Sequence, residues 1–199
     1  MSQPTQQAAS TADHRHPLQE KHDFSVDRVR RLLEPGPVVL VSSGSGNETN
    51  IMTLGWQTVM QFQPSLIGCM ISAGNHSFSL IRDSGECVIN IPDAAMIDTV
   101  ARIGNSSGAE IDKFEAFGLT PERSDQVEPP AIGECFASFE CRLHDDVLVD
   151  SYNFFILEVV KAHVARDPDR FDMLHYRGDG EFQLSGRAVE RKSLFTKVS

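Results

Sequence analysis

Short runs of apolar and β-branched residues recur along most of this 199-residue chain, separated by turns rich in glycine, proline and asparagine. The run over 66–72 is almost wholly apolar, which is typical of a central strand. Helical spacing occurs only in a few segments, which lie between strand pairs instead of after every strand. This distribution argues against a doubly wound parallel sheet and predicts a mainly antiparallel barrel or sandwich with inserted helices.

The same patterns place the individual elements. The expected strands are 38–42, 50–62 (one long strand or a bent pair), 66–72, 86–91, 135–143, 153–165 and 182–185. The expected helices are 25–33, 78–84, 93–103 and 110–117. Pro35 follows the first helix and Gly85 the second, in positions typical of helix ends. No repeat or interdomain linker is visible, so we expect one domain over 23–199.

Charge and composition exclude several classes of function. The chain carries 18 lysine and arginine residues against 28 aspartate and glutamate, a formal net charge of −10. General binding to DNA or RNA needs an excess of basic residues, so this balance predicts no nucleic-acid partner. With 40% hydrophobic and 23% charged residues, the composition is that of a folded protein. No apolar run approaches the roughly 18 residues of a spanning helix, which predicts no membrane insertion.

The first segment, residues 1–22, has no core-forming period and lacks the apolar stretch of a secretory signal. We therefore expect a disordered N-terminal tail. His14, His16 and His22 lie in this segment and could chelate a metal loosely, but a solvated tail is the better interpretation of so weak a pattern.

The cysteines predict a reducing environment. They are Cys69, Cys87, Cys135 and Cys141. None has CxxC spacing, and each lies in an apolar, strand-like run, where cysteine behaves as a small buried hydrophobe. Free thiols and a cytoplasmic location are expected, in preference to a zinc site or a catalytic thiol.

No motif for catalysis by the protein's own side chains is present. The Gly-Ser-Gly sequence at 44–46 lacks the third glycine and the following helix of a dinucleotide fingerprint. The P-loop, HExxH and GxSxG sequences do not occur. His144 and the two aspartates after it are typical of a solvated turn. If the chain is an enzyme, we expect a bound cofactor to carry the difficult step, with no catalytic side chain and no metal ligand.

The loop over 72–77 and the helix after it form the best candidate anion site. A helix N-terminus presents unpaired N–H groups and about half a positive charge. Ser77 at the predicted cap, with Asn75 and His76 beside it, adds donors for a phosphate, and Gly74 lets the backbone come close. The alternative is that Ser77 only caps the helix and that His76 is an ordinary surface residue.

The stretch over 50–58 alternates bulky apolar and small polar residues and contains the only tryptophan, Trp56. One face of such a strand could line a flat pocket. Its backbone amides and the hydroxyls of Thr53 and Thr58 would then be available to the edge of a heterocycle. The alternative is an ordinary strand with Trp56 in the core.

Several motifs, taken in order, carry a resemblance to a known family. They are Asn50-Ile51-Met52-Thr53 with Trp56, Asn75-His76-Ser77, Asp83-Ser84-Gly85-Glu86, Val88-Ile89-Asn90-Ile91-Pro92, Gly104-Asn105-Ser106-Ser107-Gly108, Asp112-Lys113-Phe114, Gly118-Leu119-Thr120, 155–162 and His175-Tyr176-Arg177-Gly178. On these motifs, which fall between about Leu32 and Gly186, the chain resembles the flavin reductase-like, FMN-binding split-barrel family. The resemblance is closest to the flavoredoxin-type branch.

The resemblance implies a mainly β fold: a six-stranded antiparallel split barrel with inserted helices, which forms a homodimer with FMN at the interface. It implies that 50–58 lines the isoalloxazine and ribityl chain, that 72–77 receives the phosphate, and that the Ser107–Lys113 region approaches the flavin. Lys113 could neutralise phosphate charge, the alternative being a solvated lysine. The implied cofactor-binding residues are Asn50, Met52, Thr53, Leu54, Trp56, Gln57, Thr58, Ser72, Asn75, His76, Ser77, Asn105, Ser107 and Lys113.

One position departs from the family pattern. Members that act as reductase partners of monooxygenases tend to carry a histidine where this chain has Tyr152-Asn153. That histidine lies near the nicotinamide side of the flavin, so its absence weakens the expectation of rapid NADH oxidation. The flavoredoxin-type interpretation is favoured accordingly.

Three functional hypotheses follow. The first is an FMN oxidoreductase that passes hydride or electrons from NAD(P)H or a redox protein partner through bound FMN to flavin or another acceptor. The second is an FMN-binding electron carrier or flavin-storage protein without direct NAD(P)H activity. The third is a split barrel that binds another planar ligand, such as a deazaflavin or haem, with His76, His144 and His163 as candidates for the haem version.

Overall fold

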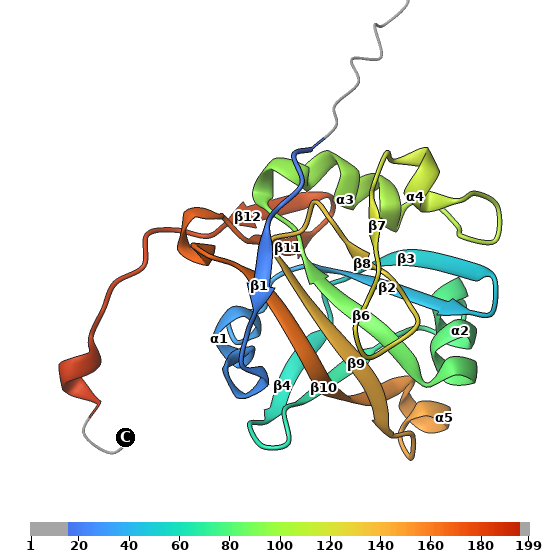
Figure 1. Ribbon diagram of the computed structural model, residues 1–199, viewed down its shortest axis with the longest axis horizontal. Helices are drawn as coiled ribbons and strands as arrows, with labels where there is room; N and C mark the ends of the chain where they lie inside the picture. Colours follow the sequence, from blue (N-terminus) through green and yellow to red (C-terminus); the bar gives the residue numbers. More distant parts are fainter. Residues whose placement is uncertain (1–15, 196–199) are drawn as a thin grey trace, which may run out of the picture.

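The structure, a computed structural model, describes residues 16–195 (Figure 1). Its main element is an eight-stranded antiparallel sheet in the order β3-β2-β6-β9-β10-β5-β4, with β1 paired to β10. The strands of this sheet are β1 (Lys21–Asp23), β2 (Val39–Ser45), β3 (Glu48–Leu54), β4 (Gln57–Gln61), β5 (Leu66–Met70), β6 (Glu86–Ile91), β9 (Ala137–Asp145) and β10 (Phe154–Ala165). Two short hairpins join β7 (Pro121–Glu122) to β8 (Ala131–Ile132) and β11 (Leu174–Gly178) to β12 (Glu181–Leu184).

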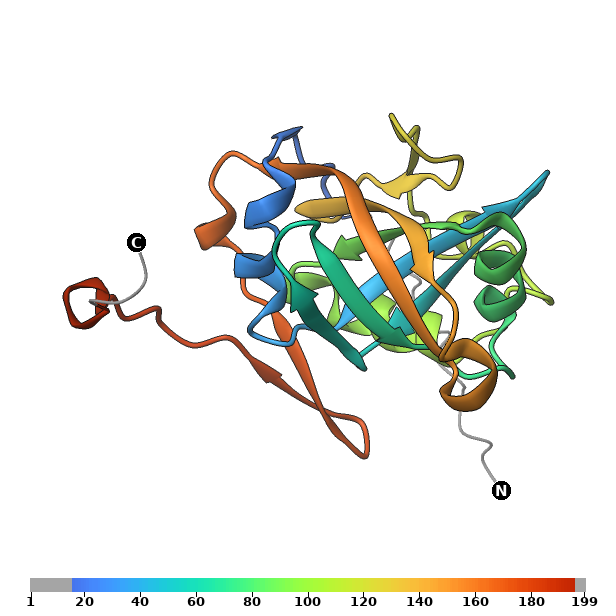
Figure 2. The ribbon, with the colours of Figure 1, turned by 90° about the horizontal axis from the view of Figure 1, so that it is seen from below.

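The sheet curves into a split barrel, as Figure 2 shows from below. β3 and β4 lie at opposite ends of the strand order although they follow one another in the chain, so the link Gly55-Trp56 joins the two edges. The predicted bend within 50–62 falls at this link. The mainly β, antiparallel barrel with inserted helices is confirmed, and its sheet holds two strands more than the six that the resemblance implies.

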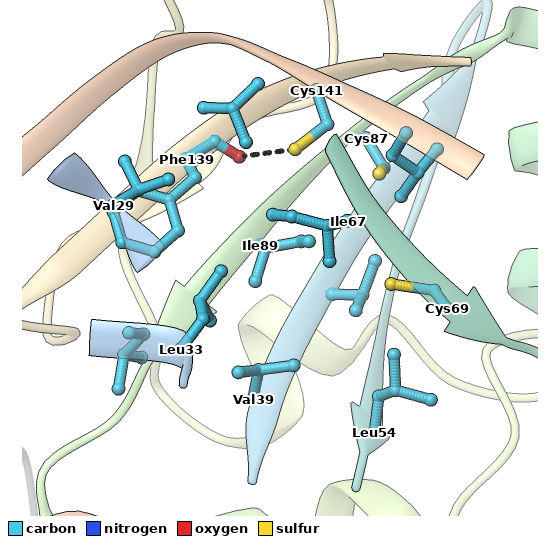
Figure 3. Close-up of a cluster of buried hydrophobic side chains, with 14 of the residues drawn as sticks. Val29, Leu33, Val39, Leu54, Ile67, Cys69, Cys87, Ile89, Phe139 and Cys141 are labelled. Carbon is cyan, nitrogen blue, oxygen red and sulfur yellow. Dashed lines mark hydrogen bonds between the residues drawn. The ribbon is translucent and has the colours of Figure 1, made fainter. Parts of the chain in front are cut away.

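The barrel interior is apolar. Alternate residues of the strands point inward, and Figure 3 shows side chains from β2, β3, β5, β6, β9 and the N-terminal helical segment packed together. The labelled members are Val29, Leu33, Val39, Leu54, Ile67, Cys69, Cys87, Ile89, Phe139 and Cys141. All four cysteines are free and buried, as predicted, and burial raises the pKa of the Cys69, Cys135 and Cys141 thiols above the ordinary range.

The helices pack against the barrel, and three of them contribute buried side chains to its interior. The helices are α1 (Arg30–Leu33), α2 (His76–Ser84), α3 (Ile97–Gly104), α4 (Lys113–Ala116) and α5 (Val149–Tyr152), with 3-10 turns at Val26–Arg28, Ala94–Met96, Pro168–Arg170 and Lys192–Leu194. Side chains of α3 and α4, including Val100 and Phe114, form a second buried cluster with Leu40 and Ile51 of β2 and β3. None of the helices within residues 16–195 is long and apolar enough to cross a membrane.

The predicted N-terminal tail is wrong for residues 16–22. β1 pairs with β10 through the register Lys21↔Ala165 and His22↔Val164. The Lys21 ammonium donates to the Ile132 carbonyl at 2.8 Å and lies 2.9 Å from the Glu122 carboxylate. β1 has only three residues, all polar, so the sequence shows no apolar alternation that would reveal the strand. Residues 1–15, including His14, lie outside the described part of the chain.

Several predicted helices are shorter than expected. The segment 25–33 holds a 3-10 turn and only the four-residue α1, and the segment 93–103 begins as a 3-10 turn before α3. Of 110–117, only α4 is helical, because the Asp112 side chain accepts from the backbone N–H groups of Phe114 and Glu115 and starts the helix there. Strand β11 and helix α5 were not predicted, since neither has a clear period.

Candidate functional site

The two stretches that the sequence singles out meet directly. Asn50 of β3 donates from Nδ2 to Oγ of Ser77 in α2 at 2.9 Å, and Oγ of Ser43 in β2 donates to the same atom at 3.0 Å. All three side chains are buried, with Ser43 and Ser77 at 0% and Asn50 at 1% exposed. We call these three residues the polar junction. It brings the predicted ring-binding strand and the predicted phosphate loop into one place.

One acceptor at the polar junction has no partner. Oδ1 of Asn50 is buried and makes no hydrogen bond within the described structure. A Cβ atom added to Gly108 would lie 2.1 Å from this oxygen, so the glycine lets the loop after α3 approach Asn50 closely. A buried carbonyl without a donor is unfavourable by about 1–3 kcal/mol. The junction is therefore suited to a ligand that brings a donor.

The loop over 72–77 is exposed up to Gly74 and then turns into α2. The residue that caps α2 is Asn75, whose side chain accepts from the Ser77 backbone N–H at 3.0 Å. The prediction that Ser77 is the cap is wrong, because the extended backbone of Asn75 places the helix start two residues earlier. Oγ of Ser72 accepts from the Gly74 N–H at 3.4 Å, so a second hydroxyl faces the same turn.

His76 is held beside this loop by a carboxylate. Its Nε2 lies 2.6 Å from Oε1 of Glu48 at the start of β3. This ion pair is compatible both with a role at the anion site and with the alternative of an ordinary surface residue. The contact adds a second link between β3 and the first turn of α2.

Lys113 is buried, only 4% exposed, so the alternative of a solvated lysine is wrong. Its ammonium donates to the backbone carbonyls of Ile51 at 2.8 Å and Ile103 at 3.1 Å. Burial lowers the pKa of Lys113 below its ordinary value. The side chain ties α4 and the end of α3 to β3, and its role in neutralising a phosphate stays a prediction.

The middle of β3 contributes chiefly through its backbone. Met52 and Leu54 are 5% exposed and belong to the barrel core. Thr53 points to the other side, where its hydroxyl donates to the Val100 carbonyl of α3 at 2.7 Å. Of the predicted side-chain donors on this strand, Thr53 is thus already engaged.

Trp56 is 69% exposed, so the alternative that places it in the core is wrong. Its carbonyl accepts from the Met70 N–H at 3.0 Å, which fixes the backbone while the indole faces outward. The next residue, Gln57, donates from Nε2 to the Pro37 carbonyl at 3.2 Å, and its buried Oε1 has no partner within the described structure.

Gln57 also lines an open cavity of about 250 Å³ beside β4. The lining residues are Leu33, Glu34, Gly36, Gln57, Thr58, Val59, Met60 and Phe62. Thr58 is exposed there, and its hydroxyl makes only a long contact of 3.4 Å to the Val59 carbonyl. The predicted residues of β4 therefore face space that a ligand or a second chain could occupy.

Asn105 and Ser107 lie in the loop after α3, which approaches Asn50 closely at Gly108. The Asn105 side chain donates to the Ala101 carbonyl at 2.7 Å, and the Ser107 hydroxyl accepts from the Ala109 N–H at 3.3 Å. These bonds are local and shape the loop. Ser43 and Gly108 were missed as site residues. Gly108 closes a glycine- and serine-rich motif, which is the one signal that could have marked it.

Tyr152 lies close to the loop 72–77, which is predicted to bind phosphate. It is 69% exposed at the end of α5, and the carbonyl of the following Asn153 accepts from the Ile71 N–H at 2.9 Å. Asn153 adopts a left-handed φ of 55°, which turns the chain from α5 into β10. The position where this chain departs from the family pattern thus borders residues 72–77.

The three candidate histidines for a haem do not converge. His144 lies 3.3 Å from Glu158, whereas His163 lies 3.2 Å from Asp125 and 3.6 Å from Glu140. Each imidazole, including that of His76, has its own carboxylate partner. This arrangement gives haem binding no support.

Comparisons with known proteins identify the family of the chain. The family model of the flavin reductase like domain matches residues 30–182. This match covers more than half of the sequence, and the chain belongs to the flavin reductase-like domain family. That family is one of flavin-binding, oxidoreductase-type proteins.

Two solved structures and one curated relative illustrate the likeness. An FMN-binding domain of a flavin reductase-like enzyme from Shewanella baltica gives a TM-score of 0.81 at 25% identity, over 88% of this chain and 99% of that one. Flavoredoxin of Desulfovibrio vulgaris (Miyazaki F) shares the fold, with a TM-score of 0.74 at 24% identity over 81% and 92%. The uncharacterized protein YddH of Escherichia coli is 31% identical over 173 residues, which cover 80% of this chain and 92% of YddH.

Proposed function

We propose that this chain binds FMN at the polar junction and acts as an FMN-dependent oxidoreductase. The observation that carries the proposal is the bond from Asn50 to Ser77, because it joins the two predicted binding stretches and leaves the Asn50 carbonyl without a donor. Membership of the flavin reductase-like family supports the same conclusion. The fold alone would not, since one fold serves many functions.

The residues present fit a flavin mononucleotide. The exposed loop 72–77 and the first turn of α2 would hold the phosphate with backbone N–H groups and the hydroxyl of Ser72. Oδ1 of Asn50 would accept a hydrogen bond from a hydroxyl of the ribityl chain. The backbone of β3 and the Trp56 side chain would face the isoalloxazine rings. Bound FMN would supply a ring nitrogen, N5, that accepts hydride from NAD(P)H or electrons from a redox protein. The protein's part is to hold and orient, and no side chain acts as an acid or base.

We further propose a homodimer with FMN at its interface, in the cytoplasm. Trp56 and Tyr152 are both 69% exposed, and they precede β4 and β10, the two strands that flank β5, whose end leads into the loop 72–77. A second subunit over this face would exclude water from the rings. The four buried, free cysteines support a reducing compartment.

An electron carrier without direct NAD(P)H activity is the second candidate. It is favoured by one observation, the exposed Tyr152 followed by Asn153 at the position where reductase partners of monooxygenases tend to carry histidine. Anaerobic stopped-flow absorbance separates the two. Rapid bleaching of the bound flavin by NADH or NADPH identifies the oxidoreductase, and bleaching only by a protein reductant identifies the carrier.

The first experiment is the ultraviolet–visible spectrum of the purified chain, alone and after incubation with FMN. We expect flavin absorbance at about 450 nm that survives gel filtration. The variant Asn50→Leu removes the free acceptor and should weaken FMN binding about tenfold, the value of one lost hydrogen bond. Thr49→Ala, on the exposed neighbouring position of β3, is the matched control. A colourless protein that gains no such absorbance would refute the proposal.

A further inference from the structure

We propose that the C-terminal arm of one copy of this chain docks on the α5 end of a second copy. The C-terminal arm is residues 186–195, which leave β12 and run away from the barrel (Figures 1 and 2). The α5 end is residues 145–152, the turn after β9 together with α5. The proposal rests on the homodimer proposed above and names the segments that hold its copies together.

The arm carries apolar side chains without a place in the barrel. Val189, Leu194 and Phe195 are 60%, 73% and 67% exposed, and none belongs to a hydrophobic cluster. The hydrogen bonds of the arm among residues 16–195 stay within the arm, for example from the Leu194 N–H to the Arg191 carbonyl at 2.9 Å. No residue between 16 and 195 of the same copy accounts for the exposure of these three side chains.

The arm is also basic in an acidic chain. The arm contains three basic residues, Arg187, Arg191 and Lys192, and one acidic residue, Glu190. The whole chain, in contrast, has 28 acidic and 18 basic side chains. A positive segment of this kind is attracted to a negative surface of another molecule and orients the encounter. The partner of the arm should therefore be acidic and partly apolar.

The α5 end has this character. Asp145, Asp146 and Asp150 are exposed, and they alternate with Val147 and Tyr152, each 69% exposed. One basic residue contacts the group: Nη1 of Arg82 lies 2.8 Å from Oδ1 of Asp150. The carboxylates of Asp145 and Asp146 are complementary in charge to the basic side chains of the arm. Val147 and Tyr152 offer apolar surface to the exposed apolar side chains of the arm.

The two segments do not meet within one copy. Both ribbon views place the arm and α5 well apart, so in this structure the arm does not cover the α5 end of its own copy (Figures 1 and 2). A second copy can supply the missing surface. When each arm crosses to the other copy, the contact is reciprocal and closes a twofold dimer without open ends.

The docked arm would complete the candidate cofactor site. The α5 end leads directly into Asn153, whose carbonyl accepts from Ile71 beside the loop 72–77. Arginine and lysine side chains of the partner's arm would then lie near the loop that we assign to the phosphate. This placement explains why the described residues of the loop itself include no lysine or arginine.

The test uses charge exchange in the full-length chain. Arg191→Glu with Lys192→Glu should weaken dimerisation about tenfold at low salt, as expected for two exposed ion pairs replaced by repulsion. Adding Asp145→Lys and Asp146→Lys to the same chain should restore the dimer dissociation constant. Arg123→Glu with Arg177→Glu, exposed positions outside the arm, makes the same change of net charge and should have no effect. Analytical ultracentrifugation over a range of concentrations measures each constant.

A crosslinking experiment locates the contact independently. Val147→Cys and Leu194→Cys introduce accessible thiols, while the four native cysteines are buried. A mixture of the two variants should give a covalent heterodimer with a short bis-maleimide. Leu18→Cys, 58% exposed in another part of the chain, replaces Val147→Cys in the control and should give none.

Three results would overturn the proposal. They are a chain that stays monomeric at all concentrations, a dissociation constant that does not respond to the arm charges, and a failure of the opposite substitutions to rescue it. Flavin absorbance is measured on the same samples. A dimer that binds FMN but does not respond to the arm charges contradicts the arm proposal alone, whereas an arm-dependent dimer without FMN contradicts only the proposed FMN function.

Discussion

The barrel core and the polar junction are both buried, yet they are built from opposite kinds of side chain. The core gathers aliphatic and aromatic residues such as Phe139 and Ile89, whose burial stabilises the fold through the hydrophobic effect. The junction buries Ser43, Asn50 and Ser77 and leaves one oxygen without a donor. Apolar burial therefore provides the stability, whereas the junction keeps a buried acceptor that has no donor among the described residues.

The largest effect is expected where the core loses an aromatic ring. Phe139 of β9 is fully buried, so Phe139→Ala should lower the free energy of unfolding by about 3–5 kcal/mol. Urea denaturation measures the change, with Phe195→Ala as the control because that ring is 67% exposed. FMN affinity of the folded fraction should stay within about twofold, since no junction residue changes. A loss of affinity as large as that of Asn50→Leu would show that core and junction are not separate.

A smaller loss is expected where the junction is overfilled. Gly108→Ala places a methyl group about 2.1 Å from the Asn50 carbonyl oxygen, too close for any relaxed contact. The loop must move, and stability should fall by about 1–3 kcal/mol, the usual range for overpacking. Gly186→Ala, which meets nothing within 4 Å, is the control. In contrast to Phe139→Ala, FMN binding should fall with stability. Unchanged binding would remove Gly108 from the site.

The buried ammonium of Lys113 should make the stability of the chain depend on pH in the alkaline range. The pKa of Lys113 is lower in the folded chain than in the unfolded chain because burial disfavours the charge. Between the two values the unfolded chain binds more protons, so the free energy of unfolding rises with pH as the ordinary value of 10.5 is approached. Lys113→Met should remove this rise. It should also lower stability at neutral pH by about 1–2 kcal/mol, because the Ile51 and Ile103 carbonyls lose their donor.

Lys161 is a control because its pKa shifts in the opposite direction to that of Lys113. Its bond to Asp23 at 2.6 Å raises the pKa of Lys161, so the stability it contributes is lost as the pH rises above the ordinary lysine value. Urea unfolding of Lys113→Met and Lys161→Met over the same alkaline range measures the two slopes relative to the parent chain. Equal slopes for Lys113→Met and the parent would contradict the predicted behaviour of the buried ammonium.

The fold could be predicted from the sequence wherever a period was strong. β6 has the predicted bounds, and the bend at Gly55-Trp56 lies within the predicted pair, because apolar alternation and turn residues are local signals. β1 could not be predicted, since its three residues are held by backbone bonds to β10, far away in the chain. α5 ends in the left-handed Asn153, and its last turn is fixed by the contact with Ile71.

In the candidate site, too, some features could be predicted from the sequence and others depend on contacts between distant parts of the chain. The pairing of 50–58 with 72–77 followed from residue types and from the family resemblance, and the bond from Asn50 to Ser77 joins the two stretches. The burial of Lys113 and the exposure of Trp56 could not be read from the chain. A lysine on a short helix is usually solvated and a tryptophan on a strand is usually in the core. Which side of a strand faces outward is decided by the partners it meets, here α3 and α4 behind β3.

Trp56→Ala should have the smallest effect on stability. The indole is 69% exposed and makes no cluster contact, so the free energy of unfolding should change by less than about 0.5 kcal/mol. Flavin affinity should nevertheless fall, because the rings lose a flat apolar neighbour. Thermal unfolding in the absence and presence of FMN measures both quantities on one sample. Equal effects of Trp56→Ala and Phe139→Ala on the apo chain would mean that the indole belongs to the core, and the contrast between core and junction would fail at its most exposed point.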